Sequence, residues 1–552
     1  MKKTVKIDFG SDRLVAIAAD LVDEHNYIGA LKMLNKNAEL NCNDEDCFML
    51  YAEIFDDIGQ YEKCVNNWFK YLDCTSVEDY AEAYEGLALA YMSLNNEHIS
   101  AYYYNKLLME SDDLDAELRG EIMKTFLNRT PNPLKFVYPP RIADFSSVIQ
   151  SGIDNMRQGK YDEAIEDFEN VDEGNSSYLS ARNYIAMCNI ICDKNDEAES
   201  ECVSVLEKDP ENVQALTILA AVRTEQKRIE ESRELARRLL EIKCKNPDDV
   251  YKIATVCCEN KLHAEAYELF CKLENELSYD VTLLFFKAVS AFNSGKTEEC
   301  FAAFDKLLTI SPDAVTAKYH YAHARELAES GKTEELSYFY RLPHEEAEST
   351  LKILSAFSKL SEAQAAKAFS VVDISDCILW CFDTGNGSNN DEIQLLGAQC
   401  AAIARLDGIV ENVLLNAFLP DSLKVSVLSF IGERNEDNSF GVVICDLYKR
   451  IDFRRIEVGR NKRKNFVYAY SRLTAHFGII DEDLGEKFAA TAEKLYLELE
   501  AADRLSYATD KDALMAAIFY RAGVKEPNVK RKQLAVFFEA DDKKIAKILG
   551  EL

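Results

Sequence analysis

Proline and glycine are scarce in this sequence: only 10 prolines and 21 glycines occur among 552 residues. Proteins contain on average about 5% proline and about 7% glycine. Because sheet sandwiches and barrels need many tight turns, this scarcity argues against an all-β fold and favours helices joined by short polar turns. Hydrophobic residues make up 47% of the chain, which is enough to build cores and excludes global disorder.

Long apolar runs are absent as well. The longest candidates, such as 393–404, contain Gln394 and Gly397 and fall short of the roughly 18 apolar residues of a membrane-spanning helix. The first residues reach Asp8 and Asp12 before an apolar run forms, so no signal peptide is expected. We therefore expect a cytoplasmic protein without a membrane partner.

Motifs for metal binding and catalysis are also missing. The 16 cysteines include no Cys-x-x-Cys pair, so we interpret them as small core residues rather than disulfides or metal ligands. His320 and His323 lie one helical turn apart, but the pattern supplies no fourth ligand. The chain lacks a Gly-x-Ser-x-Gly elbow, a phosphate-binding loop and a dinucleotide fingerprint. We expect no metal, no cofactor, no catalytic residues and no enzymatic activity.

The excess of acidic residues is confined to part of the chain. The formal net charge is −32, from 96 acidic and 64 basic side chains. Residues 1–350 contribute −29, residues 351–552 contribute −3, and 449–552 alone reach +4. Because phosphate binding depends on lysine and arginine, the chain as a whole is a poor match for nucleic acid, and only its C-terminal part is a candidate contact.

An internal repeat runs through the middle of the sequence. A small residue recurs every 34 positions, and another small residue precedes it by twelve. The later members are Ala164, Ala198, Ser232, Ala266 and Cys300, and their partners are Gly152, Ala186, Ala220, Ala254 and Ala288. Pro210 and Pro312 close their units 102 residues apart, which is three steps of 34. This period indicates stacked helix–turn–helix units.

The pattern resembles the tetratricopeptide repeat. In that family small residues lie where the two helices of a unit cross, bulky residues fill the next turn, and a proline ends the second helix. Phe168, Phe270 and Phe304 stand four residues after a small position, where an aromatic ring fills the gap to the following unit. The resemblance implies an all-α solenoid with a right-handed superhelical turn.

Looser units extend the array on both sides. Ala18 with Ala30 and Ala52 with Cys64 keep the spacing of twelve. Ala88 with Ala101 suggests a third unit that has one extra residue in its turn, and Ala324 with Gly331 suggests a last, drifting unit after Cys300. The predicted organisation is a first block of about three repeats (1–128), a proline-rich linker (129–144), a second block of about six repeats (145–341), an irregular HEAT-like helical region (342–438) and a C-terminal helical module (439–552).

The concave face of the second block is the expected binding site, because arrays of this type bind extended peptides or partner helices there. The positions one turn apart that should point inward are Asn183, Met187, Thr217, Ala221, Tyr251, Thr255, Phe285 and Val289. They are neutral, small or aromatic. Tetratricopeptide domains that clamp chaperone C-termini carry lysine and arginine here, so the resemblance disfavours a carboxylate-tail ligand.

The corresponding face of the first block is acidic. Its inward positions include Asp46, Glu53, Asp56 and Asp57. Such a wall of carboxylates would steer a basic partner by long-range attraction. The alternative interpretation is that these residues only keep a long array soluble, because the convex helices are acidic too.

The tail loses the 34-residue register but keeps helical patterns. Residues 440–458 show partial alternation of β-branched and polar residues, which predicts one short β-hairpin. Residues 532–549 resemble a helix-turn-helix, with Ala535 at the helix crossing and Glu539 where a glycine is usual. The two helices expected before it are similar in spacing to the cyclin-like fold of transcription factor IIB.

One concentrated basic run lies at 449–464. Its candidate nucleic-acid contacts are Arg450, Arg454, Arg455, Arg460, Lys462, Arg463 and Lys464. The same side chains could instead pair with acidic residues of the solenoid or of a partner. The favoured interpretation is a non-enzymatic scaffold or adaptor that binds another protein or peptide in its groove. The alternative is a nucleic-acid-associated transcriptional regulator with a basic C-terminal module. An enzyme would become the third interpretation only if the structure showed a cleft of converging ionisable groups.

Overall fold

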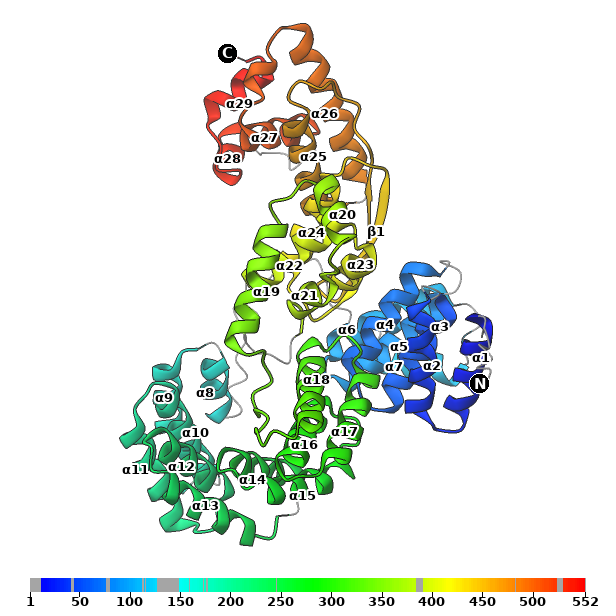
Figure 1. The fold of residues 1–552 in the computed structure, drawn as a ribbon. Helices are drawn as coiled ribbons and strands as arrows, with labels where there is room; N and C mark the ends of the chain where they lie inside the picture. Colours follow the sequence, from blue (N-terminus) through cyan, green and yellow to red (C-terminus); the bar gives the residue numbers. More distant parts are fainter. Residues whose placement is uncertain are drawn as a thin grey trace. The chain divides into compact units, whose positions relative to one another are not determined.

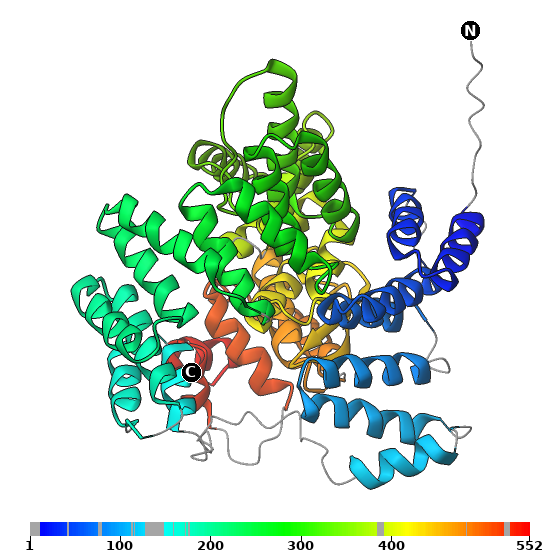
Figure 2. The same cartoon turned by 90° about the horizontal axis from the view of Figure 1, so that it is seen from below.

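The computed structural model describes residues 11–40, 44–75, 80–111, 114, 116–126, 148–157, 159–171, 173–174, 177–244, 246–383, 391–481, 483–523 and 530–551. The described chain is mostly helical (Figures 1 and 2). It divides into two compact units: unit 1 contains residues of 1–135, 313–315 and 342–552, and unit 2 contains residues of 136–312 and 316–341. The whole of the predicted linker, 129–144, lies outside the described residues.

The first block in unit 1 consists of three helical hairpins and one further helix. The helices are α1 (Ser11–Asp23), α2 (Tyr27–Glu39), α3 (Glu45–Asp57), α4 (Tyr61–Cys74), α5 (Tyr80–Ser93), α6 (Glu97–Glu110) and α7 (Ala116–Thr125). Within each hairpin the two helices are in extensive contact, and successive hairpins stack on one another.

Unit 2 contains five hairpins and a last single helix. The helices are α8 (Val148–Arg157), α9 (Tyr161–Glu169), α10 (Tyr178–Ile191), α11 (Asn195–Lys208), α12 (Val213–Glu225), α13 (Ile229–Glu241), α14 (Pro247–Glu259), α15 (His263–Glu274), α16 (Val281–Asn293), α17 (Thr297–Ile310) and α18 (Val315–Ser330). These elements confirm the predicted all-α solenoid of tetratricopeptide-type hairpins.

The same turn closes each of these hairpins. The residue before the N-cap of the second helix is left-handed, with φ between 57° and 83°, at His25, Gly59, Asn95, Gly159, Asp193, Lys227, Lys261 and Gly295. The next N–H then donates back five residues, as from Lys296 to the carbonyl of Ala291 at 2.8 Å. This bond satisfies a free carbonyl at the end of the first helix.

The turn brings a small residue to the crossing of the two helices. Four residues after each N-cap stand Ala30, Cys64, Ser100, Ala164, Ala198, Ser232, Ala266 and Cys300, all at most 1% exposed. The two serines also satisfy their hydroxyls, because Ser100 donates to the carbonyl of Ala88 at 2.7 Å and Ser232 donates to that of Ala220 at 3.0 Å. Ser100, rather than the predicted Ala101, is therefore the crossing residue, and the turn of the third hairpin has no extra residue.

The predicted last repeat is incomplete. Helix α18 ends at Ser330, and Gly331 is left-handed at φ 66° as in the other turns. No helix follows over 332–341, a stretch that the structure describes in full. The drifting register after Cys300 therefore marks the end of the array rather than another complete unit.

The rest of unit 1 consists of α-helices of 6 to 19 residues, one 3₁₀ helix and one antiparallel β-hairpin. Its elements are α19 (His344–Phe357), α20 (Glu362–Phe369), α21 (Ser375–Trp380), α22 (Asp391–Ala404), α23 (Asp407–Leu415), α24 (Asp421–Gly432), β1 (Asn438–Ile444), β2 (Leu447–Phe453), α25 (Arg463–Phe477), α26 (Asp483–Ala501), the 3₁₀ helix η3 (Leu505–Tyr507), α27 (Lys511–Arg521), α28 (Arg531–Phe537) and α29 (Asp542–Leu549). The predicted β-hairpin is confirmed, although it ends at Phe453. Glu539, between α28 and α29, adopts φ 53° in place of the usual glycine.

The β-hairpin attaches the tail to the first block. The hydroxyl of Tyr103 donates to the carbonyl of Asp446 at the hairpin turn (2.7 Å), and the hydroxyl of Tyr448 donates to Asp73 Oδ1 (2.7 Å). A Cβ at Gly441 would collide with the Asp73 carboxylate, so only glycine allows this approach. These two contacts join residues that are 343 and 375 positions apart in the sequence.

The turn geometry predicts opposite effects for two glycine substitutions in unit 1. Gly59→Ala should destabilise by about 1 kcal/mol, because the left-handed region penalises a Cβ. Gly408→Ala in α23 should stabilise by up to about 1 kcal/mol, since its Cβ would meet open space and alanine favours helix. Urea unfolding followed by circular dichroism measures both, and equal effects would contradict the role assigned to the turn.

Candidate functional site

The inner face of unit 2 is built from the first helices of successive hairpins. Helix α12 contacts both α10 and α14 directly, and the hairpins follow a curve (Figure 1). Five of the predicted groove residues lie half-buried on these helices: Met187, Thr217, Ala221, Tyr251 and Thr255. This part of the inner face therefore presents small, neutral and aromatic side chains.

The polar groups of these residues are already satisfied. The Thr217 hydroxyl donates to the carbonyl of Val213 at 2.7 Å, and the Thr255 hydroxyl donates to that of Lys252 at 2.8 Å. Burial, followed by the charge of Asp280, raises the pKa of Tyr251 to about 12, so its phenol is neutral at physiological pH. The face thus offers shape and apolar area to a ligand rather than charge.

The other three predicted groove residues require correction. Phe285 and Val289 are completely buried, because the chain itself covers α16. Asn183 is 6% exposed, and its amide donates to Asn212 Oδ1 at 3.1 Å. Asn212 in turn caps α12, so Asn183 supports the next repeat and has little surface left for a ligand.

Residues 332–341, which we name the groove segment, lie against α16 and the turn before α15 on the inner face of unit 2. Residues 332–337 of this segment have no regular secondary structure, residues 338–341 bend, and the side chains of 336–340 alternate. Leu336 is buried and Tyr338 and Tyr340 are half-buried, whereas Ser337 and Phe339 are exposed. A period of two residues is typical of an extended chain that rests on a surface.

The backbone of the groove segment is held by one side chain. Asn293 Nδ2 donates to the carbonyl of Leu336 at 2.9 Å, and the N–H of Leu336 donates to Asn293 Oδ1 at 2.7 Å. An amide that binds both backbone groups of one residue replaces the two hydrogen bonds of a neighbouring strand. This contact would accept many residue types at position 336, because it addresses only the backbone.

Side-chain contacts fix the register of the groove segment. The Tyr338 hydroxyl lies 2.8 Å from His263 Nδ1, and its ring stacks on that imidazole. Lys261 Nζ lies 2.7 Å from a Glu335 carboxylate oxygen. The Tyr340 ring meets the Phe285 ring edge to face at a centroid distance of 4.9 Å.

Sequence reasoning missed the groove segment because it continued the helical register through Gly331. One signal was available: Leu336, Tyr338 and Tyr340 alternate with Ser337 and Phe339, which is the pattern of an extended chain with one buried face. Without the helices beneath it, however, the pattern does not show what the buried face contacts.

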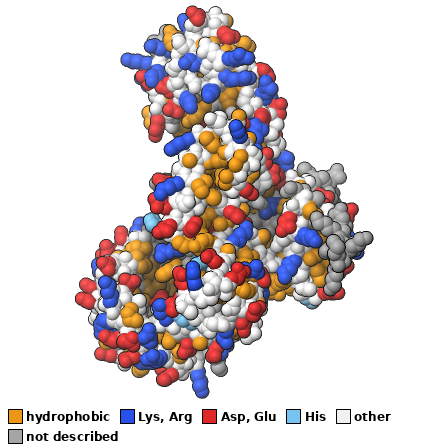
Figure 3. Space-filling view, in the orientation of Figure 1, with side chains coloured by type: hydrophobic (Ala, Val, Ile, Leu, Met, Phe, Trp, Pro, Cys, Tyr) orange, Lys and Arg blue, Asp and Glu red, His pale blue; other side chains and the backbone are white. Residues whose placement is uncertain are grey.

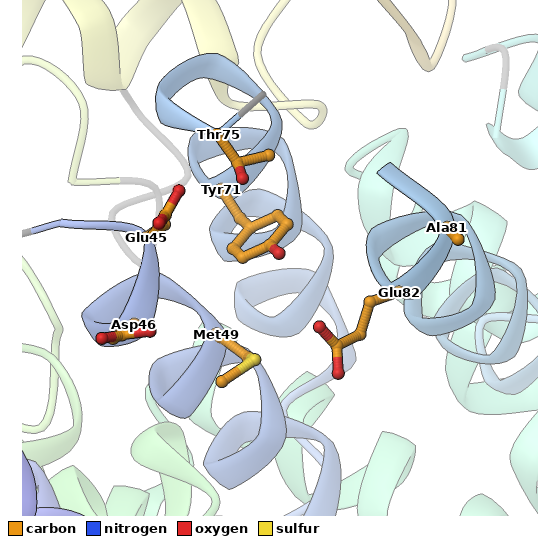
Figure 4. A pocket seen from close by; sticks show the side chains of 7 residues that line it. All are labelled: Glu45, Asp46, Met49, Tyr71, Thr75, Ala81 and Glu82. Atoms are coloured by element: carbon orange, nitrogen blue, oxygen red, sulfur yellow. The ribbon is translucent and has the colours of Figure 1, made fainter. Parts of the chain in front are cut away.

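Of the four acidic residues expected on the inner face of the first block, Asp46 lines a cavity. This cavity of about 340 Å³ is lined by Glu45, Asp46, Met49, Tyr71, Thr75, Ala81 and Glu82. Figure 4 shows the carboxylate of Glu82 pointing from α5 toward α3, on the side where Asp46 and Met49 lie. Carboxylates from two repeats therefore share one hollow, which would attract cations or basic side chains.

Charges on this surface influence one another. Partial burial, and then the negative charges of Glu82, Asp57 and Asp23, raise the pKa of Glu53. The pKa of Asp56 is raised by burial and by Asp57. Glu53 and Asp56 are nevertheless exposed at the surface, so water and salt screen much of this repulsion. On the face drawn in Figure 3, acidic and basic side chains are interspersed over unit 2.

Three of the candidate nucleic-acid contacts form ion pairs within unit 1. The pairs are Arg450 with Asp73 at 3.4 Å, Arg454 with Glu486 at 2.9 Å and Glu493 at 3.0 Å, and Arg455 with Glu457 at 3.3 Å. The structure thus shows the intramolecular pairing that the sequence left open. Among described residues, no ion pair is recorded for Arg460, Lys462, Arg463 or Lys464, of which Arg460 and Lys464 are exposed.

The described residues contain no group of three or more His, Cys, Asp or Glu side chains arranged to hold a metal ion. His320 is buried, and its Nε2 lies 3.2 Å from the carbonyl of Arg341. Its burial lowers its pKa, which favours the neutral imidazole. Among the helices that the structure describes, none is long and apolar enough to cross a membrane.

Comparisons with known proteins give matches to solved structures alone. No family model matches the sequence, and no curated protein matches it. A tetratricopeptide repeat protein from Parabacteroides merdae matches at 13% identity and a TM-score of 0.24, covering 51% of this chain and 98% of that chain. Human IFIT1, in a structure with PPP-AAAA, matches at 12% identity and a TM-score of 0.26, covering 77% of this chain and 90% of that chain. Yeast Tom70 matches at 13% identity and a TM-score of 0.21, covering 98% of this chain and 96% of that chain.

TM-scores this low carry no argument about function. The assignment to tetratricopeptide-type repeats depends instead on the crossing residues and turns described above. Those features recur in each complete hairpin of both blocks.

Replacing a carboxylate of the acidic surface should raise the free energy of unfolding in a pH-dependent way. The folded-state pKa of Glu53 is raised, so its contribution to stability is present below the unfolded pKa and lost as pH rises through the folded pKa. Glu53→Gln should therefore raise the free energy of unfolding at pH 7 by roughly 0.5 kcal/mol, and by nothing below about pH 4. Unfolding in urea at several pH values measures the effect.

Glu62→Gln is the matched control, because Glu62 is an exposed carboxylate on α4. It should leave stability unchanged at each pH. A gain for Glu53→Gln that persists at pH 3.5, where the carboxyl is protonated in both states, would exclude charge repulsion as its cause.

Proposed function

We propose that the chain is a non-enzymatic protein-interaction scaffold that binds another protein through an extended peptide on the inner face of unit 2. The observation that supports this most directly is the contact of Asn293 with Leu336. At α16 the inner face already holds a non-helical segment by its backbone, at 2.9 Å and 2.7 Å. A surface that binds backbone groups accepts an extended chain as a class of ligand.

The proposed site for a partner is the stretch of α10, α12 and α14 outside the groove segment. Met187, Thr217, Ala221, Tyr251 and Thr255 line it, and they carry no formal charge. We expect a partner peptide that places small or apolar side chains against these positions. Clamping of a terminal carboxylate would require lysine or arginine at the same positions.

Nucleic acid is not proposed as a partner. The ion pairs of Arg450, Arg454 and Arg455 occupy guanidinium groups that would otherwise contact phosphate. In addition, α29 begins with Asp542, whose carboxylate would oppose a phosphate backbone at the start of the second helix.

Substitutions that fill the inner face test the proposal. Peptides are selected from a random displayed library against the full-length chain, and their affinities are then measured by fluorescence anisotropy. Thr217→Arg and Ala221→Arg should each weaken binding at least about tenfold, because a long charged side chain occupies the site of a small neutral one.

Val203→Arg provides the matched control. Val203 is an apolar residue on α11 that is 42% exposed, so an arginine there adds the same charge and bulk on a second helix of a hairpin. It should leave the affinity unchanged. Selected peptides that bind wild type and all three variants equally would refute the inner face as the site.

A further inference from the structure

The groove segment connects the two units of the chain. Unit 2 ends with Arg341, and Leu342 begins the following part of unit 1. A linker needs no specific contacts to connect two units, and exposed polar residues would serve. This one instead directs Leu336, Tyr338 and Tyr340 to the inner face of unit 2.

The contacts of the groove segment are those of a ligand with a recognisable sequence. Lys261 pairs with the acidic residue at 335, and Asn293 bonds the backbone at 336. The rings of His263 and Phe286 pack against the aromatic residue at 338. Phe285 receives a second aromatic residue at 340. The segment that makes these contacts has the pattern acidic–Leu–x–Tyr–x–Tyr over 335–340.

The other repeats lack the group that holds this backbone. One repeat earlier, the position of Asn293 is taken by Glu259, and one repeat before that by Glu225. An ionised carboxylate accepts hydrogen bonds but donates none, so it cannot bind a carbonyl and an N–H together. Asn293 therefore marks one specialised site in the array.

We propose that the groove segment is an intramolecular ligand that blocks a peptide-binding site formed by α14, α16 and the turn before α15. A partner peptide with the pattern acidic–Leu–x–Tyr–x–Tyr binds the same site when it displaces the segment. This inference depends on the proposed function, but it concerns a different part of the inner face from Thr217 and Ala221.

Competition within one chain sets the expected affinities. A tethered segment competes at an effective concentration in the millimolar range. If a free peptide binds the empty site with a Kd of about 10 μM, wild type should bind it about 100-fold more weakly than a chain whose segment is released.

The test uses a fluorescein-labelled peptide with the sequence of residues 333–341 and the full-length chain. The release variant is Leu336→Ser/Tyr338→Ser/Tyr340→Ser, which removes the inward side chains and leaves the groove intact. It should bind the peptide about 100-fold more tightly than wild type. The control is Phe339→Ser, an outward residue that is 66% exposed, and it should behave as wild type.

Groove substitutions on the release background test the register. Asn293→Ala should abolish peptide binding. Lys261→Glu should weaken it, and a peptide with Glu335→Lys should restore it, because the exchanged charges again attract. A folded release variant that binds no peptide would overturn the proposal and leave the segment a purely structural element.

Wild-type protein gives a second readout that does not depend on the folding of the release variant. The N–H of Leu336 is bonded and its side chain buried, so hydrogen exchange there should be slow. Millimolar free peptide should accelerate exchange over 333–341, and a scrambled peptide should not. Unchanged exchange would contradict displacement. Equal binding of the selected peptides to wild type and Thr217→Arg, together with accelerated exchange over 333–341 here, would place the failure in the proposed function alone.

Discussion

The crossing of two helices at a small side chain is the constraint on which both repeat blocks depend. A left-handed residue reverses the chain, the next N–H bonds back five residues, and the fourth residue after the N-cap meets the first helix. A bulky side chain there would separate the backbones and rotate the following hairpin. Alanine, serine and cysteine all satisfy the limit of size, and each serine donates its hydroxyl to a carbonyl of the facing helix.

This uniform scaffold leaves function to the positions that the crossing does not restrict. Along the inner face the same position carries Glu225, Glu259 and then Asn293. Burial and the charge of Glu225 raise the pKa of Glu259. Neighbouring repeats therefore share one backbone geometry but differ in hydrogen-bonding capacity at this position, because two carry a carboxylate and the third carries an amide. The groove segment is held at Asn293, because an amide, unlike the two carboxylates, can bond both the N–H and the carbonyl of one residue.

Much of the fold could be predicted because its determinants are local. Spacings of twelve and thirty-four located the hairpins, and β-branched alternation located β1 and β2. The candidate site was less predictable. Phe285 and Val289 occupy groove positions in the repeat pattern, but the chain covers them. Ala101 and Ser100 are both small, and the turn that puts the N-cap at Asn96 places Ser100, rather than Ala101, at the crossing.

By itself, the sequence determined the repeat, its register and the acidic character of the array, because side-chain size and turn geometry act within one hairpin. The tertiary structure alone decided three further features. It placed Tyr103 and Asp73 of the first block against the β-hairpin, 343 and 375 positions from their partners in the sequence. It paired Arg450 and Arg454 with carboxylates of unit 1, and it laid 332–341 on the inner face of unit 2. Each depends on contacts between segments distant in the chain, and a periodic sequence pattern does not show which of these segments contact each other.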